Sequence, residues 1–263
     1  MDLGLTGRVA IITGGSEGIG KATALSMARE GARVAICARR MEVLEAAAAE
    51  VRQATGGEVL PISCDVREEA QVRQMVEQVA SEWGQIDILV NNAGTSATER
   101  FDAVTDAMWD DDLQLKVYGA IYCSRAALPY MQKAGWGRII NITTPFGKAA
   151  VGKTLPTSMS RAAGIAMTNA MSKDFASDGI LVNTVCMGLI RSGQHERRWD
   201  RSQAEDPSVT LDMWYERLGE RVPLGRVGEA EEAGDLICFL ASERASFITG
   251  TAVNVDGGMS PVV

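Results

Sequence analysis

Seven short runs of apolar and β-branched residues recur along the chain, and each predicts a buried β-strand. A segment of helical length and helical periodicity follows every run but the last, for example 19–30, 41–54 and 66–83. Strands that alternate with helices in this way predict a parallel sheet with helices on both faces. The predicted strands cover residues 8–13, 33–38, 58–63, 86–91, 138–143, 180–185 and 251–256.

A single domain accounts for this order of elements. Residues 1–263 contain no linker, low-complexity stretch or internal repeat, so we predict one α/β domain with a doubly wound, parallel, seven-stranded sheet. The least regular region is the polar stretch 192–223, between the sixth and seventh predicted strands. Insertions at the carboxyl ends of strands in such sheets commonly cover a ligand crevice. We therefore predict a substrate lid at about 192–223, with a mobile surface loop as the alternative.

Composition and charge exclude several classes of function. The chain is 46% hydrophobic and 23% charged, which is typical of a soluble globular protein. Its net charge of -8 argues against a surface for nucleic acid or anionic membrane, because such surfaces need clustered Lys and Arg. No apolar run approaches the length of a membrane helix, and the first residues lack a charged leader, so we expect a cytoplasmic protein. The five scattered cysteines and the single His195 predict no disulfide framework and no metal site.

A glycine-rich turn, TGGSEGIG at 13–20, lies between the first predicted strand and the helix after it. Its glycines let the backbone turn tightly and approach a diphosphate, whose charge is met by the amides and dipole of the helix start. The turn sits within a strand–helix–strand unit, which makes it a strong signal for a bound dinucleotide. The cofactor-binding residues predicted here are Gly14, Ser16, Gly18, Ile19 and Gly20.

The end of the second predicted strand discriminates between cofactors. An acidic residue there would bind the adenosine ribose, whereas a basic residue would accept a 2′-phosphate. This chain has Arg39 and Arg40, and a guanidinium can hold a phosphate bidentately. We therefore predict NADP rather than NAD, with Arg39 on the phosphate; a plain pair of helix-starting arginines is the alternative.

Four motifs in order identify a family resemblance. They are the TGxxxGxG turn, Asp65-Val66 after the third strand, NNAG at 91–94 after the fourth, and NVDGG at 254–258. With them the chain resembles the classical short-chain dehydrogenase/reductases over essentially its whole length. The resemblance implies a Rossmann fold and a homotetramer or homodimer, in which the Asp65 carboxylate contacts adenine and the NNAG turn closes over the adenosine side.

The family's Pro-Gly motif after the sixth strand is altered here to Cys-Met-Gly at 186–188. A serine stands where a threonine of the family usually meets the nicotinamide carboxamide, so a hydroxyl is kept at that place. The resemblance thus adds to the cofactor-binding residues Asp65, Val66, Asn92, Ala93, Gly94, Gly188 and Ser192.

The catalytic positions of the family carry different residues in this chain. Family members usually have a serine after the fifth strand, a Tyr-x-x-x-Lys on the next helix, and an asparagine on the preceding helix. By counting along the sequence, these four places fall on Thr144, Thr157, Arg161 and Lys116. Thr157 and Arg161 share one face of a helix because they are four residues apart.

These substitutions differ in their chemical consequences. Thr144 keeps a hydroxyl for a substrate oxygen, but the hydroxyl of Thr157 is far less acidic than a phenol. Arg161 stays charged and cannot relay a proton. Lys116 could replace the usual acid, since a nearby cation and partial burial both lower the pKa of a lysine. Alternatively Lys116 is a solvated or helix-capping residue, or the four side chains form a cradle for a carboxylate or enolate, or Tyr215 of the lid donates the proton.

Two functions therefore compete. The first is an NADP-dependent oxidoreductase that transfers hydride to or from a carbonyl, alcohol or enone and uses a non-standard proton donor. The second is a cofactor-binding protein without redox turnover, such as a sensor, a partner subunit or a non-redox enzyme. The first calls for a small-molecule substrate in addition to the cofactor.

Overall fold

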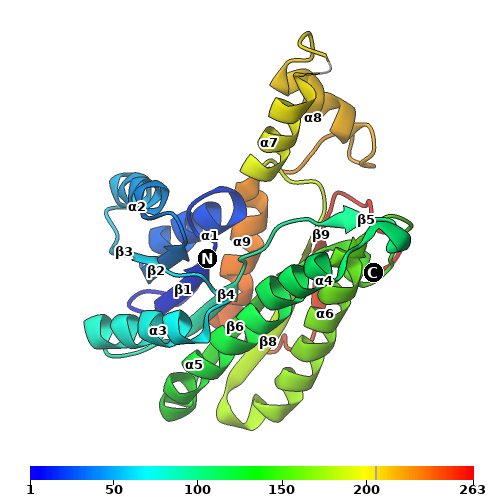
Figure 1. Ribbon diagram of the computed structural model, residues 1–263. Helices are drawn as coiled ribbons and strands as arrows, with labels where there is room; N and C mark the ends of the chain where they lie inside the picture. Colours follow the sequence, from blue (N-terminus) through cyan, green and yellow to red (C-terminus); the bar gives the residue numbers. More distant parts are fainter. Residues whose placement is uncertain (205) are drawn as a thin grey trace.

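The computed structural model describes residues 1–204 and 206–263, and within them it contains one seven-stranded parallel sheet with the strand order β3-β2-β1-β4-β6-β8-β9 (Figure 1). Each strand lies within two residues of its predicted bounds, so the predicted doubly wound α/β Rossmann fold is confirmed. The strands are β1 (Val9–Thr13), β2 (Arg33–Ala38), β3 (Val59–Ser63), β4 (Ile88–Asn91), β6 (Gly137–Thr143), β8 (Ile180–Met187) and β9 (Ala252–Val255).

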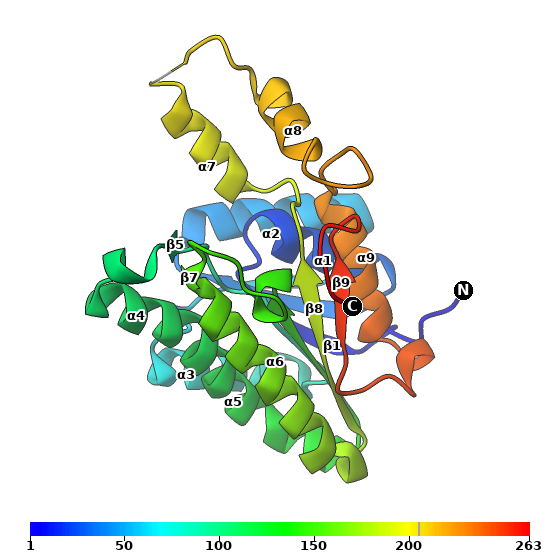
Figure 2. The same ribbon diagram turned by 90° about the vertical axis from the view of Figure 1, so that its right-hand side faces the viewer.

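Helices cover both faces of this sheet, because strands such as β1 and β4 are buried along their whole length and need apolar cover on each side. One core cluster joins the sheet to α1, α2 and α9, and a second joins it to α3 and α5, with α6 beside them (Figure 2). The helices are α1 (Gly18–Arg29), α2 (Met41–Thr55), α3 (Glu69–Trp83), α4 (Asp106–Leu113), α5 (Gly119–Ala134), α6 (Thr157–Asp174), α7 (Gly193–Ser202), α8 (Leu211–Gly219) and α9 (Ala230–Leu240).

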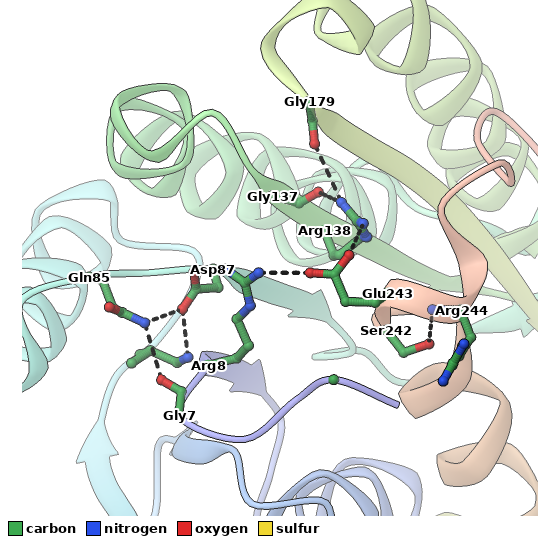
Figure 3. Close-up of polar contacts among 12 residues, drawn as sticks. Gly7, Arg8, Gln85, Asp87, Gly137, Arg138, Gly179, Ser242, Glu243 and Arg244 are labelled. Carbon is green, nitrogen blue, oxygen red and sulfur yellow. Dashed lines mark hydrogen bonds and ion pairs between the residues drawn. The ribbon is translucent and has the colours of Figure 1, made fainter. Parts of the chain in front are cut away.

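Ion pairs tie the amino ends of the central strands to the segment after α9 (Figure 3). Arg8 donates to the buried carboxylate of Asp87 at 3.0 Å and to Glu243 at 2.8 Å. Asp87 also accepts from the backbone amide of Val9, and Glu243 lies 3.9 Å from the Arg138 guanidinium. These contacts lie at the amino ends of strands β1, β4 and β6, on the side of the sheet opposite to their carboxyl ends.

Two local features differ from the expectation. Helix α3 begins at Glu69 rather than at 66, because the backbone amide of Arg67 donates to the Asp65 side chain and holds a turn there. A two-stranded antiparallel sheet, β5 (Thr98–Glu99) with β7 (Leu155–Pro156), has only two residues in each strand, too few for an apolar pattern to reveal. It joins the loop after β4 to the start of α6.

The polar stretch 192–223 is more regular than predicted. It contains α7 and α8, which project together from the body of the molecule as an arm (Figures 1 and 2); residue 205 lies outside the described residues. The indole of Trp199 in α7 donates to the carbonyl oxygen of Val209, in the segment that leads into α8, at 2.8 Å. Helix α7 is almost wholly polar and carries no apolar pattern, whereas α8 has apolar residues and a capping Thr210 that could have revealed it. Its role as a lid stays a prediction.

None of the helices in the described part of the chain is long and apolar enough to cross a membrane. No group of three or more His, Cys, Asp or Glu side chains among residues 1–204 and 206–263 is arranged to hold a metal ion.

Candidate functional site

A cleft of about 370 Å³ opens at the carboxyl ends of the strands, where doubly wound sheets bind their ligands. It extends from the end of β2 to the start of α6 and is bordered by the first residues of α7. Every predicted cofactor-binding residue except Gly20 lines it: Gly14, Ser16, Gly18, Ile19, Arg39, Asp65, Val66, Asn92, Ala93, Gly94, Gly188 and Ser192.

The glycine-rich turn has the backbone geometry that a diphosphate requires. Gly14 and Gly18 adopt positive φ angles of +66° and +53°, which other residues rarely take. No side chain caps the start of α1, so its first amides are free to donate to an anion. A Cβ on Gly20 would overlap the carbonyl oxygen of Gly14, so Gly20 serves the tight packing of the turn and does not touch the cleft. The residues present fit a dinucleotide.

The NNAG segment clamps this turn from the neighbouring strand. The Asn92 side-chain amide donates to the carbonyl oxygens of Thr13 and Gly14, at 2.9 and 3.1 Å. The backbone amides of Asn92 and Ala93 both donate to the Thr13 hydroxyl at 2.9 Å. The motif therefore holds β1 and β4 in a fixed relation under the cleft.

At the end of the cleft beside β2 and β3, the Asp65 carboxylate is already hydrogen-bonded within the protein. Arg67 donates to it through Nη2 at 2.7 Å and lowers the pKa of Asp65, against the effect of partial burial. Arg67 was not predicted as a partner of Asp65, although its place two residues after this acidic residue is a signal for an ion pair. The Arg39 side chain is exposed at the rim of the same end.

Three of the four predicted catalytic residues line the other end of the cleft, and the fourth, Lys116, lies buried behind them. Thr157 is the first residue of α6, and Arg161 follows one turn later. Both line the cleft together with Thr144. Lys116 comes from a π-helical turn, Gln114–Tyr118, which links α4 to α5 and is a distortion frequent at functional sites. Its side chain is fully buried behind Thr157, outside the cleft wall, and its Nζ donates to Thr157 Oγ1 at 2.8 Å.

Lys116 also forms a buried ion pair with Asp112, four residues earlier on the same helical surface. Burial, and next the nearby Arg161 guanidinium, lower the pKa of Lys116 to about 8, while Asp112 acts in the opposite direction. Asp112 was not predicted as a site residue. Its spacing from Lys116 in WDDDLQLK is the i,i+4 signal that could have revealed it.

The hydroxyls of the two threonines differ in what they can still bind. The Thr157 hydroxyl donates to the carbonyl oxygen of Ala97 at 2.7 Å and accepts from the amide of Ala97 and from Lys116. These three hydrogen bonds use the one donor and both acceptor sites of the hydroxyl. Thr144 Oγ1 is buried and has no hydrogen-bond partner among the described residues. Arg161 donates through Nη1 to the Ile142 carbonyl oxygen at 2.6 Å, and its buried Nε is likewise without a partner in that part of the chain. Thr144 and Arg161 thus keep free polar groups beside the cleft.

The structure places Tyr215 away from these residues. The phenol is buried at the base of the arm, against the Arg191 guanidinium, with its oxygen 3.4 Å from the Ser192 amide nitrogen. Burial raises the pKa of Tyr215, and the side chain does not line the cleft. In this position Tyr215 packs against Arg191 and cannot reach the pocket unless the arm moves, so its role as a proton donor stays a prediction.

The start of α7 supplies two cleft residues that sequence reasoning did not single out. Gln194 accepts a hydrogen bond from the Ser96 amide at 3.1 Å, so it connects the arm to the loop after β4. His195 lines the cleft, and burial, followed by Arg198 and Arg221, lowers its pKa to about 4. His195 is therefore neutral at pH 7.

The sheet, the glycine-rich turn and the cleft at the strand ends define a protein of the NAD(P)-dependent short-chain oxidoreductase class. Residues 14–260 match the family model described as Enoyl-(Acyl carrier protein) reductase, and the chain belongs to the short-chain dehydrogenase/reductase family. It is 33% identical to the 3-oxoacyl-acyl-carrier-protein reductase FabG of Thermotoga maritima, over 97% of this chain and 98% of the relative. It is 34% identical to the (2S)-[(R)-hydroxy(phenyl)methyl]succinyl-CoA dehydrogenase subunit BbsD of Thauera aromatica, with 98% of both chains covered.

Two solved structures are closely similar to this chain. L-sorbose reductase from Gluconobacter frateurii, complexed with NADPH and L-sorbose, superposes with a TM-score of 0.95 at 32% identity over 100% of both chains. An NADPH-bound short chain oxidoreductase from Pseudomonas aeruginosa PAO1, described as containing an atypical catalytic center, has a TM-score of 0.91 at 35% identity over 99% of both chains.

Proposed function

We propose that the protein is an NADP(H)-dependent oxidoreductase for a carbonyl, alcohol or enone, in which Lys116 holds the exchanged proton and Thr157 passes it on. The observation that carries this proposal is the buried hydrogen bond from Lys116 Nζ to Thr157 Oγ1 at the wall of the cleft. Lys116 and Thr157 stand at two places where the family usually has an asparagine and a tyrosine.

The cofactor assignment rests on the cleft and on the relatives. Arg39 and Arg40 line the cleft at the end of β2, where a 2′-phosphate would lie. Both solved structures described above hold NADPH. When bound, NADPH supplies the hydride, and the protein supplies position and charge. Arg161, which lines the cleft, would donate to the hydroxyls of the nicotinamide ribose.

The proton path needs three side chains. The free hydroxyl of Thr144 binds the substrate oxygen. The Thr157 hydroxyl turns from the Ala97 carbonyl oxygen to the substrate and gives up its proton, while it receives one from the Lys116 ammonium. A pKa of about 8 keeps Lys116 close to the range in which an acid–base group works best. Asp112 compensates the ammonium charge before the transfer.

The relatives favour a carbonyl or hydroxyl substrate. The Thermotoga relative is a 3-oxoacyl reductase and the Gluconobacter structure is a sorbose reductase, so both are described as reducing carbonyl compounds. The Pseudomonas structure, with its atypical catalytic center, supports the idea that the fold tolerates a changed set of catalytic residues.

A second candidate is a cofactor-binding protein without redox turnover. The saturated hydrogen bonding of Thr157 favours it, because the hydroxyl must leave Ala97 before it can serve a substrate. The buried Asp112 also gives Lys116 a purely structural reason to be charged.

Turnover separates these candidates. Purified protein is mixed with NADPH and a panel of ketones, enones and quinones, and the absorbance of the reduced cofactor is followed. We expect turnover in the wild type and a loss of about 10²- to 10⁴-fold in kcat for Lys116→Met, the range of a general acid. Lys133→Met, which removes an exposed lysine at the end of α5, is the control. Tight NADPH binding with no turnover supports the second candidate, and full kcat in Lys116→Met rules out Lys116 as the proton source.

A further inference from the structure

Glu17, the residue just before α1, bridges two arginines from distant parts of the chain. Its Oε1 accepts from Arg40 Nη2 at 2.7 Å, and its Oε2 accepts from Arg197 Nη1 at 3.0 Å. Arg40 follows β2, whereas Arg197 belongs to α7 of the arm. All three side chains line the cleft together with Arg39, the residue predicted to bind a 2′-phosphate.

A carboxylate at this place is electrostatically unfavourable for a dinucleotide. Glu17 lies within the turn that holds the diphosphate and beside the end of β2, where a 2′-phosphate adds about two negative charges at neutral pH. Repulsion between these groups costs affinity unless cations stand between them. The two guanidinia on Glu17 are the cations at hand.

We infer that Arg197 is a specificity-determining residue for the 2′-phosphate: Glu17 holds Arg40 and Arg197 at the cleft in the free protein, and the phosphate of NADP(H) draws both guanidinia onto itself. This inference rests on the proposed NADP(H) site. It adds a cation from the arm, some 160 residues further along the sequence than the arginines at the end of β2.

Charge balance supports three arginines rather than two. Glu17 and a 2′-phosphate together carry about three negative charges. Arg39, Arg40 and Arg197 offset them, whereas Arg39 and Arg40 alone leave the site negative. A guanidinium can also bind two phosphate oxygens at once. In contrast, each of the two arginines on Glu17 binds only one oxygen of the shared carboxylate.

The first turn of α7 would then respond to the type of cofactor. It is connected to both walls of the cleft, through Arg197 to Glu17 and through Gln194 to the Ser96 amide. A phosphate that binds Arg197 more strongly than Glu17 does should hold this turn more firmly, whereas NADH, which has no 2′-phosphate, should not.

Binding measurements test the inference. Dissociation constants of NADPH, NADH, adenosine 2′,5′-bisphosphate and 5′-AMP are measured for the wild type and for Arg197→Gln. We expect Arg197→Gln to weaken NADPH and adenosine 2′,5′-bisphosphate about three- to fivefold, the upper part of the range for an exposed ion pair, and to leave NADH and 5′-AMP within about twofold. Arg197→Lys should restore part of the loss. Arg201→Gln, an exposed arginine one turn later on α7, is the matched control and should change nothing.

Two further readouts test the role of Glu17 and of the arm. Glu17→Gln should tighten NADPH several-fold relative to NADH, because it removes the competing carboxylate. Hydrogen exchange of the α7 amides should slow with adenosine 2′,5′-bisphosphate and not with 5′-AMP. Equal losses for NADPH and NADH in Arg197→Gln, weaker NADPH binding in Glu17→Gln, or exchange that ignores the 2′-phosphate would each overturn the inference. Failure of the wild type to bind NADPH at all would instead refute the proposed function.

Discussion

The two ends of the cleft are built on different physical principles. The end proposed to hold the cofactor depends on backbone: positive φ angles at Gly14 and Gly18, free amides at the start of α1, and exposed cations at the rim. The catalytic end depends on buried side chains whose charges act on one another, with Lys116 and Asp112 nearly inaccessible to solvent. Substitutions at the first end should therefore change affinity, whereas substitutions at the second should change stability, pKa and rate.

The largest expected effect is on stability at the catalytic end. Asp112→Asn leaves the buried Lys116 ammonium without its counter-charge, and breaking a buried pair costs about 3–5 kcal/mol. Asp111→Asn, the neighbouring residue, removes an exposed partner of Arg67 and should cost at most about 1 kcal/mol. Denaturant unfolding at pH 6 measures both. Equal losses for the two variants would contradict the buried pair.

The cofactor end should respond through affinity. Gly20→Ala forces a methyl group against the Gly14 carbonyl oxygen and to within 2.7 Å of Asn92 Nδ2, so the turn must open. We expect NADPH affinity to fall at least about tenfold, equivalent to about 1.4 kcal/mol. Gly152→Ala, at a glycine with no atom within 4 Å of the added Cβ, is the control. Isothermal titration with NADPH decides the outcome; unchanged affinity would mean that the turn is not the diphosphate site.

The lowered pKa of Lys116 predicts two pH effects. In carbonyl reduction kcat should fall about tenfold per pH unit above about 8, as the Lys116 ammonium loses its proton. This decrease of kcat at high pH should be absent in Lys116→Met. For stability, the unfolded chain binds the proton more tightly than the folded one. The contribution of Lys116 to the free energy of unfolding should therefore rise as pH increases from about 8 towards 10.5. Rate profiles and unfolding at several pH values measure these effects; a flat kcat above pH 8 would count against Lys116.

The smallest expected effect separates activity from stability at a single hydroxyl. Thr144→Val keeps the shape of the side chain and removes a buried oxygen that has no partner among the described residues. Stability should stay equal or rise, since an unsatisfied polar group is lost. Turnover should fall about three- to tenfold, the worth of one hydrogen bond of about 0.5–1.5 kcal/mol to the substrate. Thermal unfolding and kcat/KM are compared in the same preparation, and a drop in stability without a change in kcat/KM would show a structural role.

The sequence predicted the fold and the cofactor end in detail because both depend on local chemistry. Alternating apolar runs and helical segments can be recognised from neighbouring residues alone, and the glycines of the turn at 13–20 predict its backbone geometry. Helix α7 was missed because it is almost wholly polar, and α8 was missed although its apolar residues and the capping Thr210 signal a helix. The two-residue strands β5 and β7 are too short to leave a pattern.

Taken by itself, the sequence determined the order of the strands in the chain, the place of the glycine-rich turn and the residue types at 116, 144, 157 and 161, the positions predicted to be catalytic. Only the tertiary structure decided what these residues can do. It buried Lys116 with Asp112 behind Thr157, left Thr144 without a partner, packed Tyr215 away from the cleft and brought Arg197 to Glu17. The reason is physical: burial and the distance between charges set a pKa or an ion pair, and both depend on elements that lie far apart in the sequence.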